Sequence, residues 1–282
     1  IDSFLPLFLL PAFYTTYKSL SAEKQKNRLI FLTGLLLGIA VVFKQVIIPL
    51  SLLVMIYLFW QSKRIKTALI FLSGFLPPIF LLISYFLQIG VWGDFWYWTV
   101  IFNLTVFAKY GKKAASSVGY IIRVVFVFGT SVLVFFSEDR KLVHILAIFI
   151  IGSLAGAFAR FDFIHFQPVL PFALIATVAG FSSIQMKKIL KIIILCYVFV
   201  AFWWSINFYR GHISDRVILF DNETIAIAKK IQQYSKPGEK IFILGAPLHL
   251  YQITQTLPAG DIFVFQFPWF LKVSQNRILE GV

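Results

Sequence analysis

Charged residues and cysteine are scarce in this sequence of 282 residues. Only 13 % of the residues are charged, against roughly 25 % in an average soluble domain. The single cysteine, Cys196, excludes an intramolecular disulfide and a zinc site built from cysteines. Neither a Gly-x-Ser-x-Gly elbow nor a P-loop motif occurs, and the four histidines lack metal-ligand spacing. The sequence therefore offers no motif of a serine hydrolase, a P-loop nucleotidase or a structural metal site.

Apolar residues are correspondingly abundant. Hydrophobic side chains make up 59 % of the chain and aromatic ones 18 %, and the mean hydropathy is +0.84. Long apolar runs separated by short polar loops are typical of a polytopic membrane protein. No basic n-region with a small-residue cleavage site precedes the first run, so this run does not resemble a signal peptide. Because the chain begins with Ile1, we expect a fragment that lacks its native N-terminal helices.

The basic residues are concentrated in short loops. A net charge of +14 would indicate a nucleic-acid partner for a soluble protein. Here, however, many Lys and Arg residues lie in loops between apolar runs, which is the pattern of cytoplasmic loops. We therefore expect membrane lipids and no nucleic acid among the partners. The loop residues are Lys18, Lys24, Lys26 and Arg28; Lys63, Arg64 and Lys66; Arg140 and Lys141; and Lys187, Lys188 and Lys191.

The apolar runs predict an all-α polytopic membrane bundle with about eight transmembrane helices. The chain from residue 29 to residue 60 is interrupted only by Lys44-Gln45. As one helix this segment would be about 48 Å long, whereas the hydrocarbon core is about 30 Å thick. We therefore predict a hairpin with Lys44 at the outer face. The predicted crossings are residues 4–17, 29–43, 46–60, 67–88, 118–136, 143–158, 169–184 and 192–208.

The composition changes after residue 208. Residues 1–208 read as the transmembrane domain, and residues 209–282 as a small extracytoplasmic α/β domain. In the second domain the pattern predicts a helix from residue 221, a strand over 240–245, a helix over 247–254 and a strand over 261–265. This order suggests a small α/β unit in which the two strands could pair in parallel.

An aromatic segment lies between two predicted crossings, over residues 90–117. Trp and Tyr prefer the membrane–water interface, so the segment is typical of a helix that lies on the membrane surface. The alternative is a lid over a lipid-linked substrate. The aromatic residues are Trp92, Phe95, Trp96, Tyr97, Trp98, Phe102 and Phe107.

Five polar residues reach one membrane face in this topology, opposite the basic loops. They are Lys44, Asp94, Arg160, Asp162 and His165. Ionisable groups are costly near hydrocarbon, so such a set indicates a functional site. Cations beside an apolar groove suit a lipid phosphate or diphosphate, because Arg, Lys and His all donate to phosphate oxygens. The alternatives are an interfacial turn that meets water at residues 160–165, a snorkelling Lys44 and a structural hydrogen bond of His165.

Three segments carry motifs that resemble one family. Residues 34–45 form a glycine-rich apolar run that ends in Lys44-Gln45; Asp94-Phe95-Trp96-Tyr97-Trp98 precedes Asn103-Leu104; and Arg160-Phe161 precedes His165, Pro168 and Pro171. These segments are similar to the glycine-rich helix, the aromatic external loop and the Arg-Phe…His-Tyr…Pro…Leu-Pro segment of the dolichyl-phosphate-mannose-protein mannosyltransferase-like and aminoarabinose-transferase-like membrane glycosyltransferases. Phe166 stands where Tyr is usual.

The resemblance implies a C-type glycosyltransferase fold in a bacterial inner membrane. Such an enzyme moves a sugar from a polyprenyl-phosphate donor to a lipid, glycan or protein acceptor on the non-cytoplasmic face. Lys44, Arg160 and His165 would bind the donor phosphate. The catalytic acidic residue of the family lies in the first external loop, which matches no segment here, so we expect it upstream of Ile1. No cofactor is certain, and the resemblance leaves a divalent metal possible.

Two other classes use similar residues. A transporter or flippase for an anionic lipid or polysaccharide would use the same cations, but should show related halves and charges deep within its helices. An O-antigen ligase or polymerase-like protein would also take a lipid-linked substrate on the external face. Its external loop pattern would differ, so the sequence before residue 1 would separate the classes.

Overall fold

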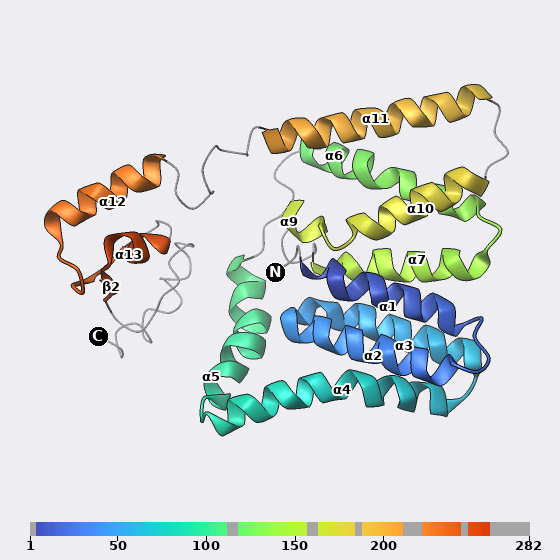
Figure 1. Ribbon diagram of the computed structural model, residues 1–282, viewed down its shortest axis with the longest axis horizontal. Helices are drawn as coiled ribbons and strands as arrows, with labels where there is room; N and C mark the ends of the chain where they lie inside the picture. Colours follow the sequence, from blue (N-terminus) through green and yellow to red (C-terminus); the bar gives the residue numbers. More distant parts are fainter. Residues whose placement is uncertain are drawn as a thin grey trace. The chain divides into compact units, whose positions relative to one another are not determined.

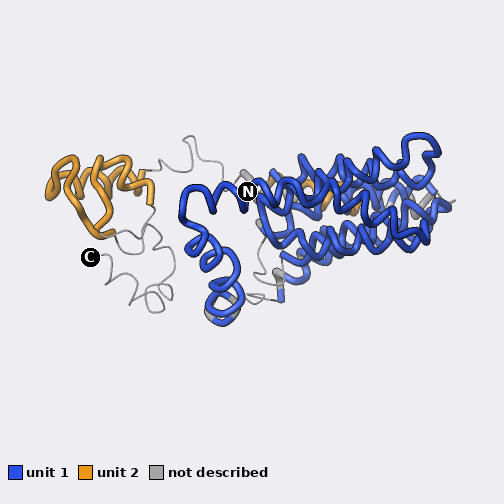
Figure 2. Tube along the Cα trace, turned by 90° about the horizontal axis from the view of Figure 1, so that it is seen from below, with its two compact units in different colours: residues 1–195 blue, residues 196–282 orange. Residues whose placement is uncertain are grey.

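The computed structural model describes residues 4–111, 118–156, 163–183, 188–210, 222–243 and 248–259. These residues are mostly helical (Figure 1) and form two compact units, 1–195 and 196–282 (Figure 2). The predicted domain boundary at residues 208/209 stays a prediction. The helices up to residue 210 are α1 Pro6–Ser19, α2 Lys26–Phe43, η2 Gln45–Ile47, α3 Ile48–Ser62, α4 Ile65–Gln88, α5 Trp92–Trp96, η3 Tyr97–Ile101, η4 Asn103–Gly111, α6 Val118–Phe128, η5 Gly129–Phe136, α7 Arg140–Ser153, α9 Phe163–Phe166, α10 Leu170–Ser183 and α11 Lys188–Arg210.

Three helical segments are long and apolar enough to cross a membrane: Lys26–Phe43, Gln45–Ser62 and Ile65–Gln88. The predicted break between the first two is confirmed, since α2 ends at Phe43 and Lys44 takes an extended conformation (φ −156°, ψ 111°). Shorter apolar helices follow over Val124–Phe136, Leu170–Ser183 and Ile194–Trp203. The count of about eight crossings stays a prediction.

A glycine seam joins α2 to α4. The carbonyl oxygens of Phe71 and Phe75 in α4 lie where a Cβ on Gly34 and Gly38 of α2 would sit, and Gly74 of α4 meets the backbone of Phe31 in the same way. Small residues spaced in this manner allow two helix backbones to touch, as at helix interfaces within membranes. The pairs advance in the same direction along both helices, so α2 and α4 run parallel (Figure 1). α3, which connects them in the sequence, therefore runs in the opposite direction, as the predicted hairpin requires.

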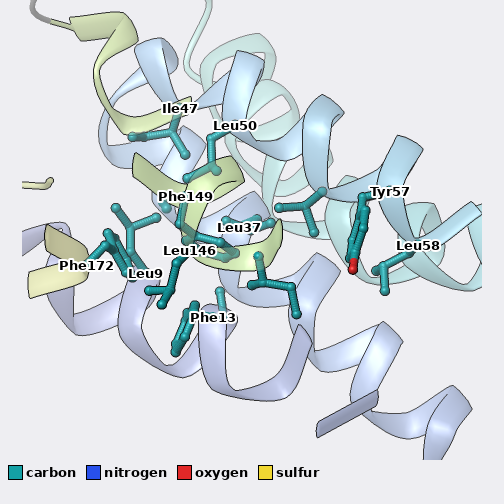
Figure 3. Packing of buried hydrophobic residues seen from close by; sticks show 14 of the residues in the cluster. Leu9, Phe13, Leu37, Ile47, Leu50, Tyr57, Leu58, Leu146, Phe149 and Phe172 are labelled. Carbon is teal, nitrogen blue, oxygen red and sulfur yellow. The ribbon is translucent and has the colours of Figure 1, made fainter. Parts of the chain in front are cut away.

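α7 packs on α3, α1 packs on α2 and α7, and α10 packs on η5 and α7. On α7, Gly152 lies against Leu50, and the His144 ring lies 6.1 Å from that of Tyr57, so α7 is antiparallel to α3. α1 is antiparallel to both α2 and α7. The core between them is formed by leucine, isoleucine and phenylalanine side chains (Figure 3). In the same way α10 runs parallel to η5, because Gly180 meets the backbone of Leu133 and Thr177 donates to Thr130 at 3.0 Å.

Because of these directions, the loops that precede α2, α4 and α7 lie at the same end of this unit. We call it the basic end. The Tyr17 hydroxyl donates to the Asp139 carboxylate at 2.6 Å, and Lys141 reaches the Ser21 hydroxyl at 3.5 Å. Asp139 also caps α7, accepting from the backbone N–H groups of Lys141 and Leu142. The structure thus brings the basic loops around residues 18–28, 63–66 and 140–141 together, as the charge pattern predicts.

The outer surface of this unit is strongly apolar. Large hydrophobic side chains on α3, α4, α6 and η5 are exposed, for example Ile65 at 67 % and Leu81 at 72 %. Only 11 % of the most apolar window of α4 is buried. Among the described residues, the buried polar side chains of this unit are all Ser or Thr. A water-soluble bundle would not expose so much apolar area, whereas a bilayer would cover it.

The described part of the second unit is small and mixed. Besides the end of α11, it holds α12 Asn222–Tyr234, β1 Lys240–Ile241, α13 His249–Thr254 and β2 Leu257–Pro258, and the strands pair in parallel. The N–H groups of Leu257 and Ala259 donate to this pairing, so Pro258, which has no N–H, fits between them. The predicted strand at 261–265 lies outside the described residues, and the strand at Leu257–Pro258 was not predicted.

The glycine seam gives a stability prediction. We expect Gly34→Ala to lower the free energy of unfolding by about 1–3 kcal/mol, because its Cβ must displace the Phe71 backbone rather than a flexible side chain. Thermal unfolding in detergent micelles, followed by circular dichroism, measures the change. The matched control is Gly129→Ala, since a Cβ on Gly129 would meet nothing within 4 Å. Equal midpoints for the two variants would contradict the seam.

The hydrogen bond from Tyr17 to Asp139 gives a pH-dependent prediction. This bond and the two capping N–H groups hold the pKa of the Asp139 carboxyl below its ordinary value. A lowered folded pKa contributes stability above the unfolded pKa of about 3.9, and this stability is lost as the pH falls through the folded pKa. At pH 7 Tyr17→Phe should cost about 1 kcal/mol or less, because the pair is partly exposed.

The difference in stability between wild type and Tyr17→Phe should become smaller below about pH 4, where the carboxylate of the unfolded chain is protonated. Unfolding midpoints recorded between pH 3 and pH 7 test this. Tyr14→Phe is the matched control, since Tyr14 lies on the same helix and is 56 % exposed. A pH-independent difference would show that the carboxylate is not the partner that matters.

Candidate functional site

The break between α2 and α3 forms one side of the candidate site. The Lys44 N–H still bonds the Ala40 carbonyl at 2.9 Å and so ends α2, while the extended backbone of Lys44 redirects the chain into η2. Lys44 is half-buried. Because α2 begins in the basic end, the break lies at the opposite end of this unit (Figure 1). A long cation at this level can extend along apolar surface with its ammonium in water.

The aromatic segment forms the other side. It is helical over the described residues 92–111, where α5 leads into the π-helical turns η3 and η4. Rings stack along it: Phe95 lies on Phe86 of α4 with centroids 4.1 Å apart, and Trp92 lies 5.9 Å from Trp96. No side chain of α5 or η3 is buried. The rings are half-buried, apart from Trp96, which is 46 % exposed. That this helix lies at the membrane–water interface stays a prediction.

One hydrogen bond joins the two sides. The Gln45 side-chain amide donates to the Thr99 carbonyl at 2.6 Å, across 54 residues of sequence. The Asn103 amide donates to the same carbonyl at 2.8 Å, and to that of Trp98 at 3.2 Å. π-Helical turns are rare and frequently occur at functional sites. Gln45 therefore fixes the aromatic segment beside Lys44.

The structure places the predicted residues as follows. Asp94 is exposed and lies in the first turn of α5, more than one helical turn before Thr99. His165 is half-buried in the short helix α9, where the neighbouring Phe166 packs on Phe128 with centroids 5.6 Å apart. Lys44, Asp94 and His165 thus belong to elements at one end of this unit, opposite the basic end. A carboxylate in a first helical turn is also favourable for the helix alone.

Arg160 and Asp162 lie outside the described residues. The chain that leads to them is described up to Gly156. A Cβ on Gly156 would lie 3.4 Å from the side chain of Val46, two residues after Lys44. Gly156, the last described residue before this gap, therefore lies beside the α2–α3 break.

Gln45 was not among the predicted site residues. An uncharged amide between two apolar runs gives a weak signal, and its partner is a backbone carbonyl that the sequence does not mark. A useful clue was that Gln45 stands at the break itself, where a polar side chain near hydrocarbon needs a hydrogen-bond partner.

Comparison of the chain with protein-family models, with curated proteins and with solved structures gave no match. Within the described ranges, no three His, Cys, Asp or Glu side chains gather in a group that could hold a metal ion. The motifs at residues 34–45, 94–104 and 160–171 therefore remain the basis of the family resemblance.

The bond from Gln45 to Thr99 predicts a measurable restraint on the aromatic segment. Gln45→Ala should release it and raise the rate of trypsin cleavage after Lys109 by roughly fivefold, the equivalent of a hydrogen bond of about 1 kcal/mol. Gln88→Ala is the matched control, because Gln88 is an exposed amide at the end of α4. Equal cleavage rates in the two variants would show that Gln45 does not hold the segment.

Proposed function

We propose that the chain is part of a membrane glycosyltransferase that takes a sugar from a polyprenyl-phosphate donor. The acceptor is a lipid, a glycan or a protein on the non-cytoplasmic face of a bacterial inner membrane. The observation that carries the proposal is the hydrogen bond from Gln45, the residue after Lys44, to Thr99 of the aromatic segment, at the end opposite the basic loops. A cation beside interfacial rings suits a phosphate that is attached to a long apolar tail.

The chemistry asked of this chain is charge stabilisation. An acceptor hydroxyl attacks the anomeric carbon, and the bond from that carbon to the phosphate oxygen breaks with both electrons going to the polyprenyl phosphate. The acceptor proton goes to a general base, for which we assign no residue. Lys44, Arg160 and His165 would donate to the phosphate oxygens and stabilise their growing charge, so the leaving group needs little protonation. Asp94 and Asp162 would contact the sugar hydroxyls or the cations.

The aromatic segment would guide the lipid. Its rings lie beyond the end of α4, whose surface is exposed and apolar. A polyprenyl chain could therefore run along α4 while its phosphate reaches the level of Lys44. The predicted domain of residues 209–282, which we place outside the cytoplasm, would help to select the acceptor.

The donor-phosphate assignment is tested by alanine at Lys44 and at Arg160 in the full-length protein. Each should lower transfer from the polyprenyl-phosphate sugar, or raise the donor KM, by about 10- to 100-fold, the usual cost of losing a hydrogen bond to a charged group. Lys141→Ala is the control, since this cation lies in the basic end. If both variants left transfer and donor affinity unchanged, these residues would not bind the donor.

The same protein separates the rival classes. A transporter or flippase would move the lipid-linked sugar across vesicle membranes with no new glycosidic bond. An O-antigen ligase or polymerase-like protein would require a polyprenyl-diphosphate oligosaccharide and ignore a monophosphate donor. Product analysis with the two donors in proteoliposomes therefore distinguishes all three functions.

A further inference from the structure

The glycine seam also places two basic segments side by side at the basic end. Gly34 and Gly38 of α2 meet Phe71 and Phe75 of α4, so the first turns of the two parallel helices are neighbours (Figure 1). The cations at these turns come from loops far apart in sequence. We call them the α2–α4 basic patch: Lys26, Arg28, Lys63, Arg64 and Lys66.

The positive charge of this patch has little compensation from the helices that carry it. Neither α2 nor α4 has an acidic residue in its first turn or a side-chain cap. Because the helices are parallel, the positive ends of their dipoles add to the cations. All members of the patch are exposed except Lys26, which is half-buried. The nearest acidic residue in sequence is Glu23, which is exposed in the loop before α2.

Exposed apolar side chains begin directly beyond the cations. Ile65 and Leu69 on α4 are 67 % and 58 % exposed, and Phe31 on α2 is 38 % exposed. Lys63 extends its ammonium to 5.5 Å from the ring centroid of Trp60, which is itself 55 % exposed. Tryptophan prefers the level of lipid headgroups. The surface therefore changes from cationic to interfacial to apolar within a few residues.

We propose that the α2–α4 basic patch binds the phosphate of an anionic phospholipid headgroup, with the acyl chains lying on the exposed apolar side chains of α2 and α4. A soluble anion would complement the charge of the cations but would not cover the apolar surface beside them. A zwitterionic lipid would cover that surface but would not neutralise the net positive charge of the patch. Polybasic clusters near membrane surfaces attract anionic lipids in this way. The proposal is independent of glycosyl transfer.

The test compares two quadruple variants of the full chain that remove the same charge from the same end. The site variant is K26Q/R28Q/R64Q/K66Q, and the control variant is K18Q/K24Q/R140Q/K141Q. Each is incorporated into nanodiscs of phosphatidylcholine with 30 % phosphatidylglycerol, or of phosphatidylcholine alone. Native mass spectrometry after detergent extraction counts the retained lipids, with and without 10 mM inorganic phosphate as competitor. Circular dichroism checks that each variant is folded.

We expect wild type and the control variant to retain phosphatidylglycerol in preference to phosphatidylcholine. The site variant should lose this preference by roughly fivefold for each cation that contacts the headgroup. Equal losses in the two variants would show general surface charge rather than a site, and full displacement by inorganic phosphate would show a soluble-anion site. Either result would overturn the proposal. Should the site variant misfold, the single variants Lys26→Gln and Lys66→Gln, against Lys24→Gln, give the same comparison.

Discussion

The close approach of α2 and α4 is the constraint on which this helical unit depends. Backbone touches backbone at Gly34, Gly38 and Gly74, and such contact is possible only where no Cβ intervenes. Such contacts determine both how far the two helices are shifted along their axes and in which direction they run relative to each other. Because they run parallel, α3 must run in the opposite direction, and the chain must turn between α2 and α3. Lys44 stands at this turn, less than two helical turns after Gly38.

The turn that follows α2 also explains the hydrogen bond from Gln45 to Thr99, which lies at the end of this unit opposite the basic end. A chain that leaves a helix near hydrocarbon exposes backbone and side-chain polar groups that need partners. Gln45 satisfies its amide with the Thr99 carbonyl, and Asn103 shares that carbonyl. Within the core, Thr16, Ser51 and similar residues instead bond carbonyls of their own helices. Hydrogen bonds between distant segments also occur inside the bundle, where the Thr15 and Thr33 hydroxyls lie 2.8 Å apart and Thr177 donates to Thr130 at 3.0 Å. The bond from Gln45 to Thr99 differs from these because it lies at a helix end, where ligands can also reach.

Length and charge predicted two features of the first unit, the break at Lys44 and the gathering of the basic loops. The break at Lys44 followed from comparing helix length with bilayer thickness, and the gathering of the loops followed from where Lys and Arg occur. The helix that Gly34 contacts could not be predicted. The sequence shows where small residues occur but not which helix they face. The contact from Gln45 to Thr99 spans 54 residues and ends on a backbone atom. In the second unit β2 was missed because strands were predicted from longer apolar runs. β2 has only two residues, and one of them is Pro258.

The two ends of this unit differ in how a cation acts on phosphate. At the basic end several cations lie close together, and each contributes to a broad positive potential. Salt screens this potential, and it attracts many anionic headgroups in a similar way. At the opposite end Lys44 is half-buried, and the neighbouring Gln45 bonds the aromatic segment at Thr99. A half-buried charge is screened less by salt than an exposed one, so it interacts more strongly with one anion. A structural lipid therefore suits the basic end, and a phosphate that must be held at one position suits the end that carries Lys44.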